Sequence, residues 1–189
     1  EKSFFNLTND AKTGKMAKLN SCLKVNLKEL EDSSRGAGEL SGLSTSFPEL
    51  DKYLLGMQSG QLIILAARPG MGKTSLALNI GTRSCKATKL PVAIFSLEML
   101  DSELSMRILS SEAKVDSKRL RTKNFLDTDL RNIGHAVQEL SSLPMYINDN
   151  GGMTVPDILS NCRKIKSEAG LGLIIIDYLQ LRSEEHTSE

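Results

Sequence analysis

The stretch 62–74 constrains the fold of this chain more than any other part of the sequence. A short apolar run, 62–66, is followed by a glycine-rich turn, a Lys-Thr pair and residues that favour a helix. A strand, a glycine-rich loop and a helix in this order are typical of a phosphate-binding P-loop. Gly70 and Gly72 allow the backbone N–H groups to face an anion, and the helix that begins near Lys73 adds the positive end of its dipole. The sequence therefore predicts a site for a nucleoside triphosphate.

The residues of this loop have separate expected roles. We expect the phosphates to be bound by the whole loop, which consists of Ala67, Arg68, Pro69, Gly70, Met71, Gly72, Lys73 and Thr74. Lys73 would bring a mobile positive charge to the β- and γ-phosphates, and the Thr74 hydroxyl would ligate Mg²⁺. The usual motif, G-x-x-x-x-G-K-[ST], begins with glycine, whereas this chain has Ala67 there. Alanine fits this position if its φ is negative.

Composition sets broad limits on this chain. Its 189 residues suit one domain with a linker, and its net charge of +1 neither supports nor excludes nucleic acid as a partner. Three isolated cysteines predict reduced thiols in a cytoplasmic protein. No apolar run is long enough for a membrane span, so we expect no membrane association. The first residue is Glu1 instead of Met, which indicates a processed chain or a fragment.

Strands and helices alternate from residue 42 onward, which predicts an α/β fold with a mainly parallel sheet. We expect strands at 62–66, 91–97, 145–147 and 173–177, and helices at 73–85 and 154–170 and after Asp101, Asp116 and Thr128. The core stripe of the helix after Thr128 is expected to be Leu130, Ile133, Val137 and Leu140. We place a linker region at 1–34, the domain at 35–181 and a non-native tail at 182–189.

Two acidic residues follow predicted strands. Asp177 ends a run of four apolar residues, and ligands gather at the carboxyl ends of the strands in open α/β sheets. We therefore expect Asp177 to hold Mg²⁺ through water. Glu98 follows the strand 91–97 and has two equally supported interpretations. It could be the base that deprotonates the attacking water, or a first-turn residue that favours the dipole of the next helix.

Four blocks of sequence, in their order, resemble the DnaB family of replicative DNA helicases. They are Gly42-Leu43-Ser44-Thr45-Ser46-Phe47 through Leu50-Asp51, the loop 66–74, Phe95-Ser96-Leu97-Glu98-Met99, and Ile174-Ile175-Ile176-Asp177-Tyr178-Leu179-Gln180-Leu181. The resemblance covers about residues 40–181, and 1–34 resembles the family's interdomain linker. The family often has alanine at the position of Ala67.

The resemblance implies a RecA-like motor, here truncated, that uses ATP and Mg²⁺. It further implies a homo-hexameric ring that moves along single-stranded DNA and unwinds the duplex, with a primase and a helicase loader as partners. Lys73 and Glu98 would be the catalytic residues, with Glu98 as the base, and Thr74 and Asp177 would hold the metal. The family's primase-contacting domain, DNA-contacting loops and arginine finger would lie outside this fragment, so the fragment alone would be inactive.

Two rival functions differ from this expectation. One is a RecA-like ATPase of the KaiC or RadA kind that is not a replicative helicase. The other is a nucleotide-binding switch without turnover, against which Glu98 argues.

The tail 182–189 contains no apolar residue and does not resemble the family's continuation. Its eight residues equal one reading frame of a common sequencing adapter that begins AGATCGGAAGAGC. Our hypothesis is that the native sequence stops at Leu181.

Overall fold

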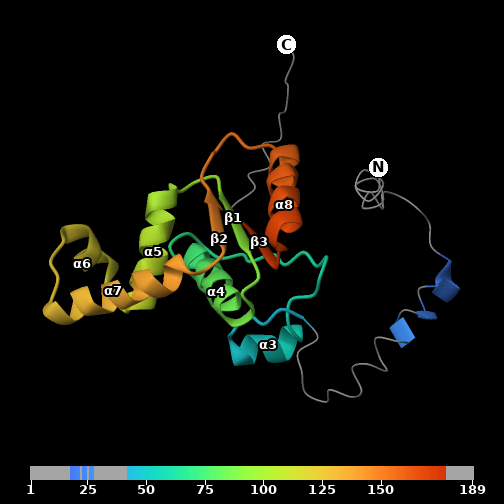
Figure 1. Cartoon of the computed structure of the whole chain (residues 1–189), viewed down its shortest axis with the longest axis horizontal. Coiled ribbons are helices and arrows are strands. Elements are labelled where there is room, and N and C mark those ends of the chain that lie inside the picture. The colour runs from blue at the N-terminus through green and yellow to red at the C-terminus, as the bar shows by residue number, and fades with distance from the viewer. Residues whose placement is uncertain (1–17, 22, 25, 28–41, 178–189) are drawn as a thin grey trace, which may run out of the picture. The chain divides into compact units, whose positions relative to one another are not determined.

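The computed structural model describes residues 18–21, 23–24, 26–27 and 42–177 (Figure 1). The chain divides into two units, 1–41 and 42–189. In the first unit the described residues from Leu19 onward are helical, and Leu19, Leu23 and Leu27 are exposed. Most of the predicted linker and the whole tail 182–189 lie outside the described residues, so the domain boundaries and the hypothesis about the tail stay predictions.

The second unit is built on a parallel sheet of three strands in the order β2-β1-β3 (Figure 1). β1 spans Val92–Ser96, β2 spans Met145–Asn148 and β3 spans Leu173–Asp177. β1 lies in the middle and all five of its residues are buried. Continuous apolar runs of this kind are typical of parallel strands covered on both faces. The prediction of a parallel α/β sheet is confirmed.

Helices cover both faces of this sheet. The chain contributes α4 (Lys73–Thr88), α5 (Asp101–Ala113), α6 (Ser117–Thr122), α7 (Asp127–Ser141) and α8 (Val155–Ala169). α4 and α5 lie on one face and α8 lies on the other (Figure 1). A shorter helix, α3 (Pro48–Leu54), precedes them, and the sequence analysis does not predict it.

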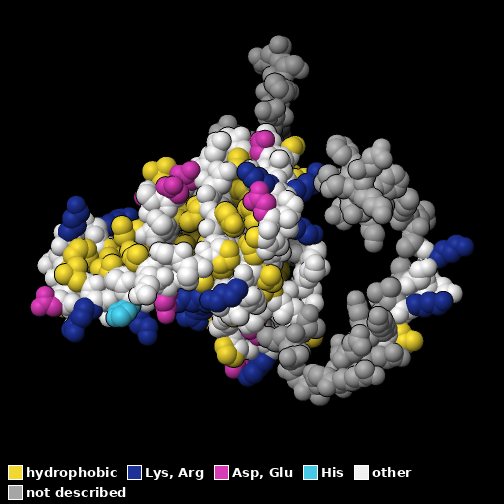
Figure 2. Space-filling model, viewed as in Figure 1, with side chains coloured by type: hydrophobic (Ala, Val, Ile, Leu, Met, Phe, Trp, Pro, Cys, Tyr) yellow, Lys and Arg dark blue, Asp and Glu magenta, His cyan; other side chains and the backbone are white. Residues whose placement is uncertain are grey.

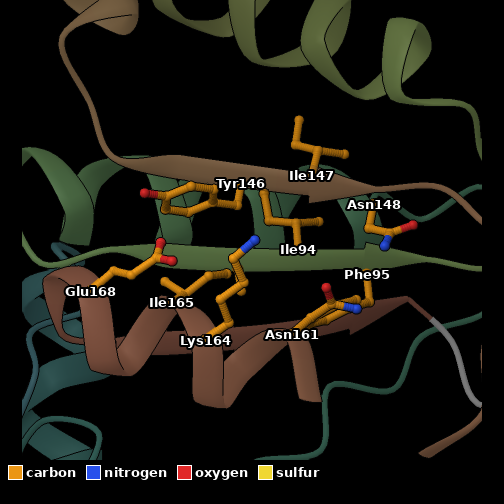
Figure 3. Close-up of a pocket in the computed structure, with 10 residues that line it drawn as sticks. Ile94, Phe95, Tyr146, Ile147, Asn148, Asn161, Lys164, Ile165 and Glu168 are labelled. Carbon is orange, nitrogen blue, oxygen red and sulfur yellow. The ribbon is translucent and has the colours of Figure 1, made fainter. Parts of the chain in front are cut away.

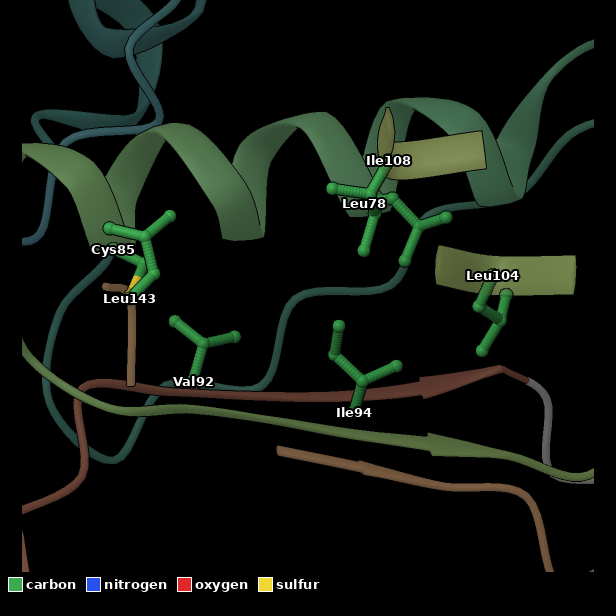
Figure 4. Packing of buried hydrophobic residues seen from close by; sticks show 7 residues of the cluster. All are labelled: Leu78, Cys85, Val92, Ile94, Leu104, Ile108 and Leu143. Atoms are coloured by element: carbon green, nitrogen blue, oxygen red, sulfur yellow. The ribbon is translucent and has the colours of Figure 1, made fainter. Parts of the chain in front are cut away.

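The core follows from the alternation of side chains along β1. Val92 and Ile94 point toward α4 and α5, where they pack with a buried apolar cluster: Leu78, Cys85, Leu104, Ile108 and Leu143 (Figure 4). Ala93 and Phe95 point the other way and pack with Ile158 and Cys162 of α8. Burial raises the pKa of the Cys85 and Cys162 thiols, which makes both poor nucleophiles.

Two predicted helix starts are confirmed by their hydrogen bonds. The carboxylate of Asp116 accepts a bond of 2.7 Å from the backbone N–H of Lys118 at the start of α6. At the start of α8, the carboxylate of Asp157 accepts bonds from the backbone N–H and the hydroxyl of Thr154. α7 begins at Asp127 with Leu126 as its N-cap, so the predicted cap at Thr128 is wrong by two residues.

The predicted strand at 62–66 does not form. These residues have no regular secondary structure, and Leu62 and Ile64 are 85% and 81% exposed. An apolar run becomes a strand only where a neighbouring strand accepts its backbone hydrogen bonds. β3 pairs with β1 on one side, and no strand in the described ranges pairs with its other side. The segment has the right composition for a strand but no described partner.

The predicted core stripe of α7 is half wrong. Ile133 and Leu140 pack against the core, but Leu130 and Val137 are 54% and 46% exposed. The buried contact of α7 is made instead by Ala136, which belongs to a cluster with residues of α5 and α6. Figure 2 shows hydrophobic side chains exposed over the α5–α7 helices and over β2. None of the helices in the described ranges is long and apolar enough to cross a membrane.

The block 42–51 forms a polar cluster around Asp51, which is only 6% exposed. Its carboxylate accepts hydrogen bonds from the Ser44 hydroxyl (2.7 Å), the Thr45 hydroxyl (2.7 Å) and the Thr45 N–H (2.9 Å). The hydroxyl of Ser84 on α4 donates to the Ser44 carbonyl oxygen. The cluster therefore ties α3 to the P-loop helix.

Candidate functional site

The glycine-rich loop adopts the backbone that its sequence requires. Gly70 and Gly72 have φ values of 78° and 85°, in the region that favours glycine. A Cβ atom at either position would meet no atom within 4 Å, so the backbone conformation, and not crowding, requires glycine. Ala67 is not among the described residues with positive φ, which meets the condition set for alanine.

α4 begins at Lys73 directly after this loop. Gly72 is its N-cap and has no side chain that could accept a hydrogen bond from the first turn. The N–H groups of a first turn have no partner inside the helix, and the helix dipole adds partial positive charge there. The start of α4 can therefore receive an anion.

Lys73, Thr74 and Asp177 meet at this end of α4, although more than 100 residues separate Asp177 from the other two in the sequence. The Lys73 Nζ lies 2.8 Å from Asp177 Oδ1, and the Thr74 hydroxyl donates to Asp177 Oδ2 at 2.6 Å. Asp177 is 6% exposed, whereas 30% of the Lys73 side chain is exposed. The carboxylate at the end of β3 is thus in contact with both polar side chains that begin the P-loop helix.

The strand register brings Glu98 to the same edge of the sheet. Ser96 of β1 lies opposite Asp177 of β3, and the Leu97 N–H donates to the Asp177 carbonyl oxygen at 2.8 Å. Glu98 follows immediately and is exposed. Glu98 after β1 and Asp177 at the end of β3 thus lie at one edge of the sheet, where Lys73 and Thr74 contact Asp177.

Two residues that the sequence analysis did not single out hold the loop that carries Glu98. The Ser96 hydroxyl bonds to both the N–H and the carbonyl oxygen of Met99. The carboxylate of Asp149, which follows β2, accepts from the Asp101 N–H at 3.0 Å and caps α5. A single polar residue at the end of the apolar run 92–95 was the available signal for Ser96. The contact of Asp149 depends on the fold and has no local signal.

The donor set suits a nucleotide with a divalent cation. A hydroxyl and a carboxylate are oxygen ligands of the kind that Mg²⁺ prefers, and phosphate oxygens complete such sites. Lys73 and the N–H groups of α4 are the complementary donors for phosphate. An exposed carboxylate at the same edge can accept a proton from water.

A cavity of about 260 Å³ lies away from this cluster. It is bounded by β1 and β2 on one side and by α8 on the other, with Tyr146, Lys164 and Glu168 at its wall (Figure 3). None of the P-loop residues lines it. The candidate nucleotide site thus lies outside this cavity, at the exposed glycine-rich loop.

Comparison of the sequence with known proteins identifies the family. The family model described as the DnaB-like helicase C-terminal domain matches residues 42–189. The replicative DNA helicase DnaC of Bacillus subtilis (strain 168) is 39% identical over 181 residues, which make up 96% of this chain and 40% of that protein. The replicative DNA helicase DnaB of Geobacillus stearothermophilus is 43% identical over 157 residues, which make up 80% of this chain and 35% of that protein. The chain thus spans about 40% or less of the length of these two relatives.

Solved structures agree with the fold. One of them, described as an ATPase domain, has a TM-score of 0.80 at 26% identity, over 93% of this chain and 62% of that one. A DnaB-like replicative helicase, whose structure was described with its interactions with primase, has a TM-score of 0.74 at 24% identity, over 93% of this chain and 42% of that one. The fold is the RecA-like α/β fold that the sequence predicts. The chain belongs to the family of DnaB-like helicases, and residues 42–189 match its C-terminal domain.

Proposed function

We propose that this chain is part of the ATP-hydrolysing motor of a replicative DNA helicase. In the full-length protein, ATP hydrolysis would drive movement along single-stranded DNA and separation of the duplex. The contact of Lys73 and Thr74 with Asp177, at the edge of the sheet that also carries Glu98, is the observation that supports this proposal most. The match to the DnaB-like family favours this function over a RecA-like ATPase of the KaiC or RadA kind.

In this proposal the P-loop residues exchange partners when MgATP binds. Lys73 leaves Asp177 and binds the β- and γ-phosphates, while backbone N–H groups of 67–74 surround them. Asp177 and Thr74 are then free to hold Mg²⁺. Mg²⁺ held there would neutralise part of the negative charge on the transferring phosphoryl group.

Glu98 acts as the general base in this proposal. The alternative interpretation, a first-turn residue of the next helix, is weakened by where that helix begins. α5 begins at Asp101, three residues after Glu98, and its first-turn acids are Asp101 and Glu103. Asp149 already caps the α5 N-terminus. An exposed Glu98 beyond the end of β1 is thus better explained by contact with the attacking water.

The proposed partners follow from the family. They are single-stranded DNA, five further copies in a hexameric ring, a primase and a helicase loader, for a protein that works in the cytoplasm. Support comes from the names of the relatives, which are replicative DNA helicases, and from a structural neighbour described with primase.

The test is Glu98→Gln in the full-length protein. The amide keeps the size of the side chain but cannot accept the proton, and loss of a general base typically lowers the rate by about two to four decades. We expect ATP hydrolysis and unwinding of a forked DNA to fall by that amount, with MgATP binding kept. Glu103→Gln, which changes an exposed first-turn acid of α5, is the matched control and should stay near the parent. Hydrolysis by the Glu98 variant within a fewfold of the parent would refute the assignment.

A further inference from the structure

The position of Glu98 depends on the backbone of a short loop, residues 97–100, that joins β1 to α5. Its carboxylate makes no hydrogen bond or ion pair with another residue in the described ranges, and the residue is exposed. The position of a side chain that makes no contacts of its own is set by the peptide groups on either side of it. The contacts of those peptide groups therefore decide where Glu98 points.

One buried hydroxyl fixes the peptide group after Glu98. Ser96 is 0% exposed, and its hydroxyl accepts a hydrogen bond of 3.0 Å from the Met99 N–H. The same hydroxyl donates a bond of 2.8 Å to the Met99 carbonyl oxygen. A serine hydroxyl has one proton to donate and can accept as well, so both bonds form together. They close a tight loop over Leu97 and Glu98.

The neighbouring contacts fix the rest of the loop. The Leu97 N–H belongs to the ladder with β3 through its bond to the Asp177 carbonyl oxygen. At the far end, the Asp101 N–H is held by the Asp149 carboxylate. Met99, the residue that directly follows Glu98, is held by its two backbone bonds to the Ser96 hydroxyl and by the packing of its side chain against the buried cluster that contains Ile94 and Leu104.

Packing alone does not explain a serine at this place. The preceding residues 92–95 of β1 are all apolar and buried, and a buried hydroxyl is unfavourable unless it is hydrogen-bonded. An alanine would fill nearly the same volume without that requirement. Both described bonds of the hydroxyl go to Met99, so its contribution is to the shape of the loop that carries Glu98.

We propose that Ser96 is a positioning residue for Glu98, which it holds at the edge of the sheet beside Asp177 by clamping Met99. This inference rests on the proposed role of Glu98 as the general base. Ser96 is fully buried and both of its hydroxyl bonds go to Met99, so its removal should lower kcat and leave the KM for ATP almost unchanged. A misplacement of about 1 Å can cost on the order of a hundredfold in rate.

The experiment is a double-mutant cycle in the full-length protein, with kcat and KM for ATP measured in the presence of single-stranded DNA. The four proteins are the parent, Ser96→Ala, Glu98→Gln and the double variant. We expect Ser96→Ala to lower kcat by about 10- to 100-fold with a KM change below about threefold. In the Glu98→Gln background the same substitution should change kcat by less than about threefold, because there is no base left to misplace.

A matched control separates positioning from loss of stability. Ser84 is also buried, at 1% exposure, and its hydroxyl also bonds to a backbone oxygen, but it lies about 16 Å along α4 from Lys73. Ser84→Ala should keep kcat near the parent even where its melting temperature falls as much as that of Ser96→Ala. If Ser96→Ala does not fold, Ser96→Cys replaces it in the cycle, because a thiol keeps the size of the side chain but hydrogen-bonds weakly.

Each outcome decides the proposal. An equal fall of kcat in both backgrounds, or a kcat within threefold of the parent, would overturn the positioning role of Ser96. A fall of kcat in Ser84→Ala that matches that of Ser96→Ala would overturn it too. If Glu98→Gln itself keeps the parent rate, the proposed role of Glu98 fails first, and the positioning role falls with it.

Discussion

Asp177→Asn separates the two roles that we assign to the contact between Asp177 and the P-loop helix. The Asp177 carboxylate forms an ion pair with Lys73 at 2.8 Å and accepts a hydrogen bond from Thr74 at 2.6 Å. Lys73 must leave this pair before it can bind phosphate, and the negative charge of Asp177 repels the phosphates as well. The asparagine keeps the size of the side chain but removes the charge. We therefore expect metal-free ATP to bind the variant more tightly than the parent.

The exposure of the two side chains sets the magnitude. Exposed ion pairs contribute roughly 0.2–1 kcal/mol, and hydrogen bonds to charged groups contribute roughly 1.5–3 kcal/mol. With the Lys73 side chain 30% exposed and the Asp177 side chain 8% exposed, the pair lies between these cases. We take a value of about 1.4 kcal/mol, which corresponds to a tenfold change in affinity. The Kd for metal-free ATP should thus fall about tenfold, whereas the Kd for MgATP should rise because a metal ligand is lost.

The assay is calorimetric titration of the full-length parent and variant, first with ATP in the presence of a chelator and then with MgATP. Glu168→Gln removes one negative charge from the exposed side of α8 and is the matched control; both of its affinities should stay within twofold of the parent. Metal-free ATP that binds Asp177→Asn no more tightly than the parent would refute the partner exchange.

Two further predictions concern the block 42–51 and the P-loop backbone. Burial raises the pKa of the Asp51 carboxyl, but hydrogen bonds from Ser44, Thr45 and the Ser46 backbone outweigh burial and lower it. Asp51→Ala leaves the buried Thr45 N–H without its partner and should lower the free energy of unfolding by about 3 kcal/mol in urea titration, and Asp51→Asn by less. The pKa of the Asp51 carboxyl is lower in the folded state than in the unfolded state. The stability difference between the parent and Asp51→Asn should therefore be complete above about pH 5 and shrink as the pH falls below about 4. A difference that does not depend on pH would contradict this reasoning. Gly72→Ala places a side chain at a φ of 85°, which costs about 1–2 kcal/mol, and should weaken MgATP binding about tenfold by calorimetry. The control is Gly134→Ala within α7, where φ is not positive and MgATP affinity should not change; equal effects at the two glycines would refute the argument.

The sequence predicted the elements whose signals are local. The apolar runs at 92–95 and 173–176 became β1 and β3, which pair in parallel. β1 is buried throughout, as expected of a central parallel strand, whereas Ile174 and Ile176 of β3 are exposed in this structure. The run at 62–66 has the same composition and did not become a strand, because strand formation also requires a neighbour. Periodicity likewise identified the apolar face of α7 but not the extent to which α5 covers it. Leu130 and Val137 are exposed for that reason.

The candidate site was predicted to a similar degree. Lys73, Thr74 and Asp177 could be assigned because each follows from a motif on a strand or helix, and the structure brings them into contact. Their roles, and that of Glu98, remain predictions for the experiments above. Ser96 and Asp149 could not be assigned, because their bonds depend on how β1 and the segment after β2 approach the same loop. Such contacts arise from the register of the sheet and leave no spacing pattern in the sequence.

The titration of MgATP into the full-length protein and its Lys73→Ala variant tests the central claim most directly. In the described ranges Lys73 is the lysine that joins the P-loop helix to Asp177, and our account gives it the β- and γ-phosphates. Lys52→Ala, which removes an exposed lysine paired with Glu49 on α3, is the control and should bind MgATP like the parent. We predict a binding isotherm for the parent and the control and no measurable binding for Lys73→Ala. Parent-like affinity in Lys73→Ala would contradict the assignment of the nucleotide site.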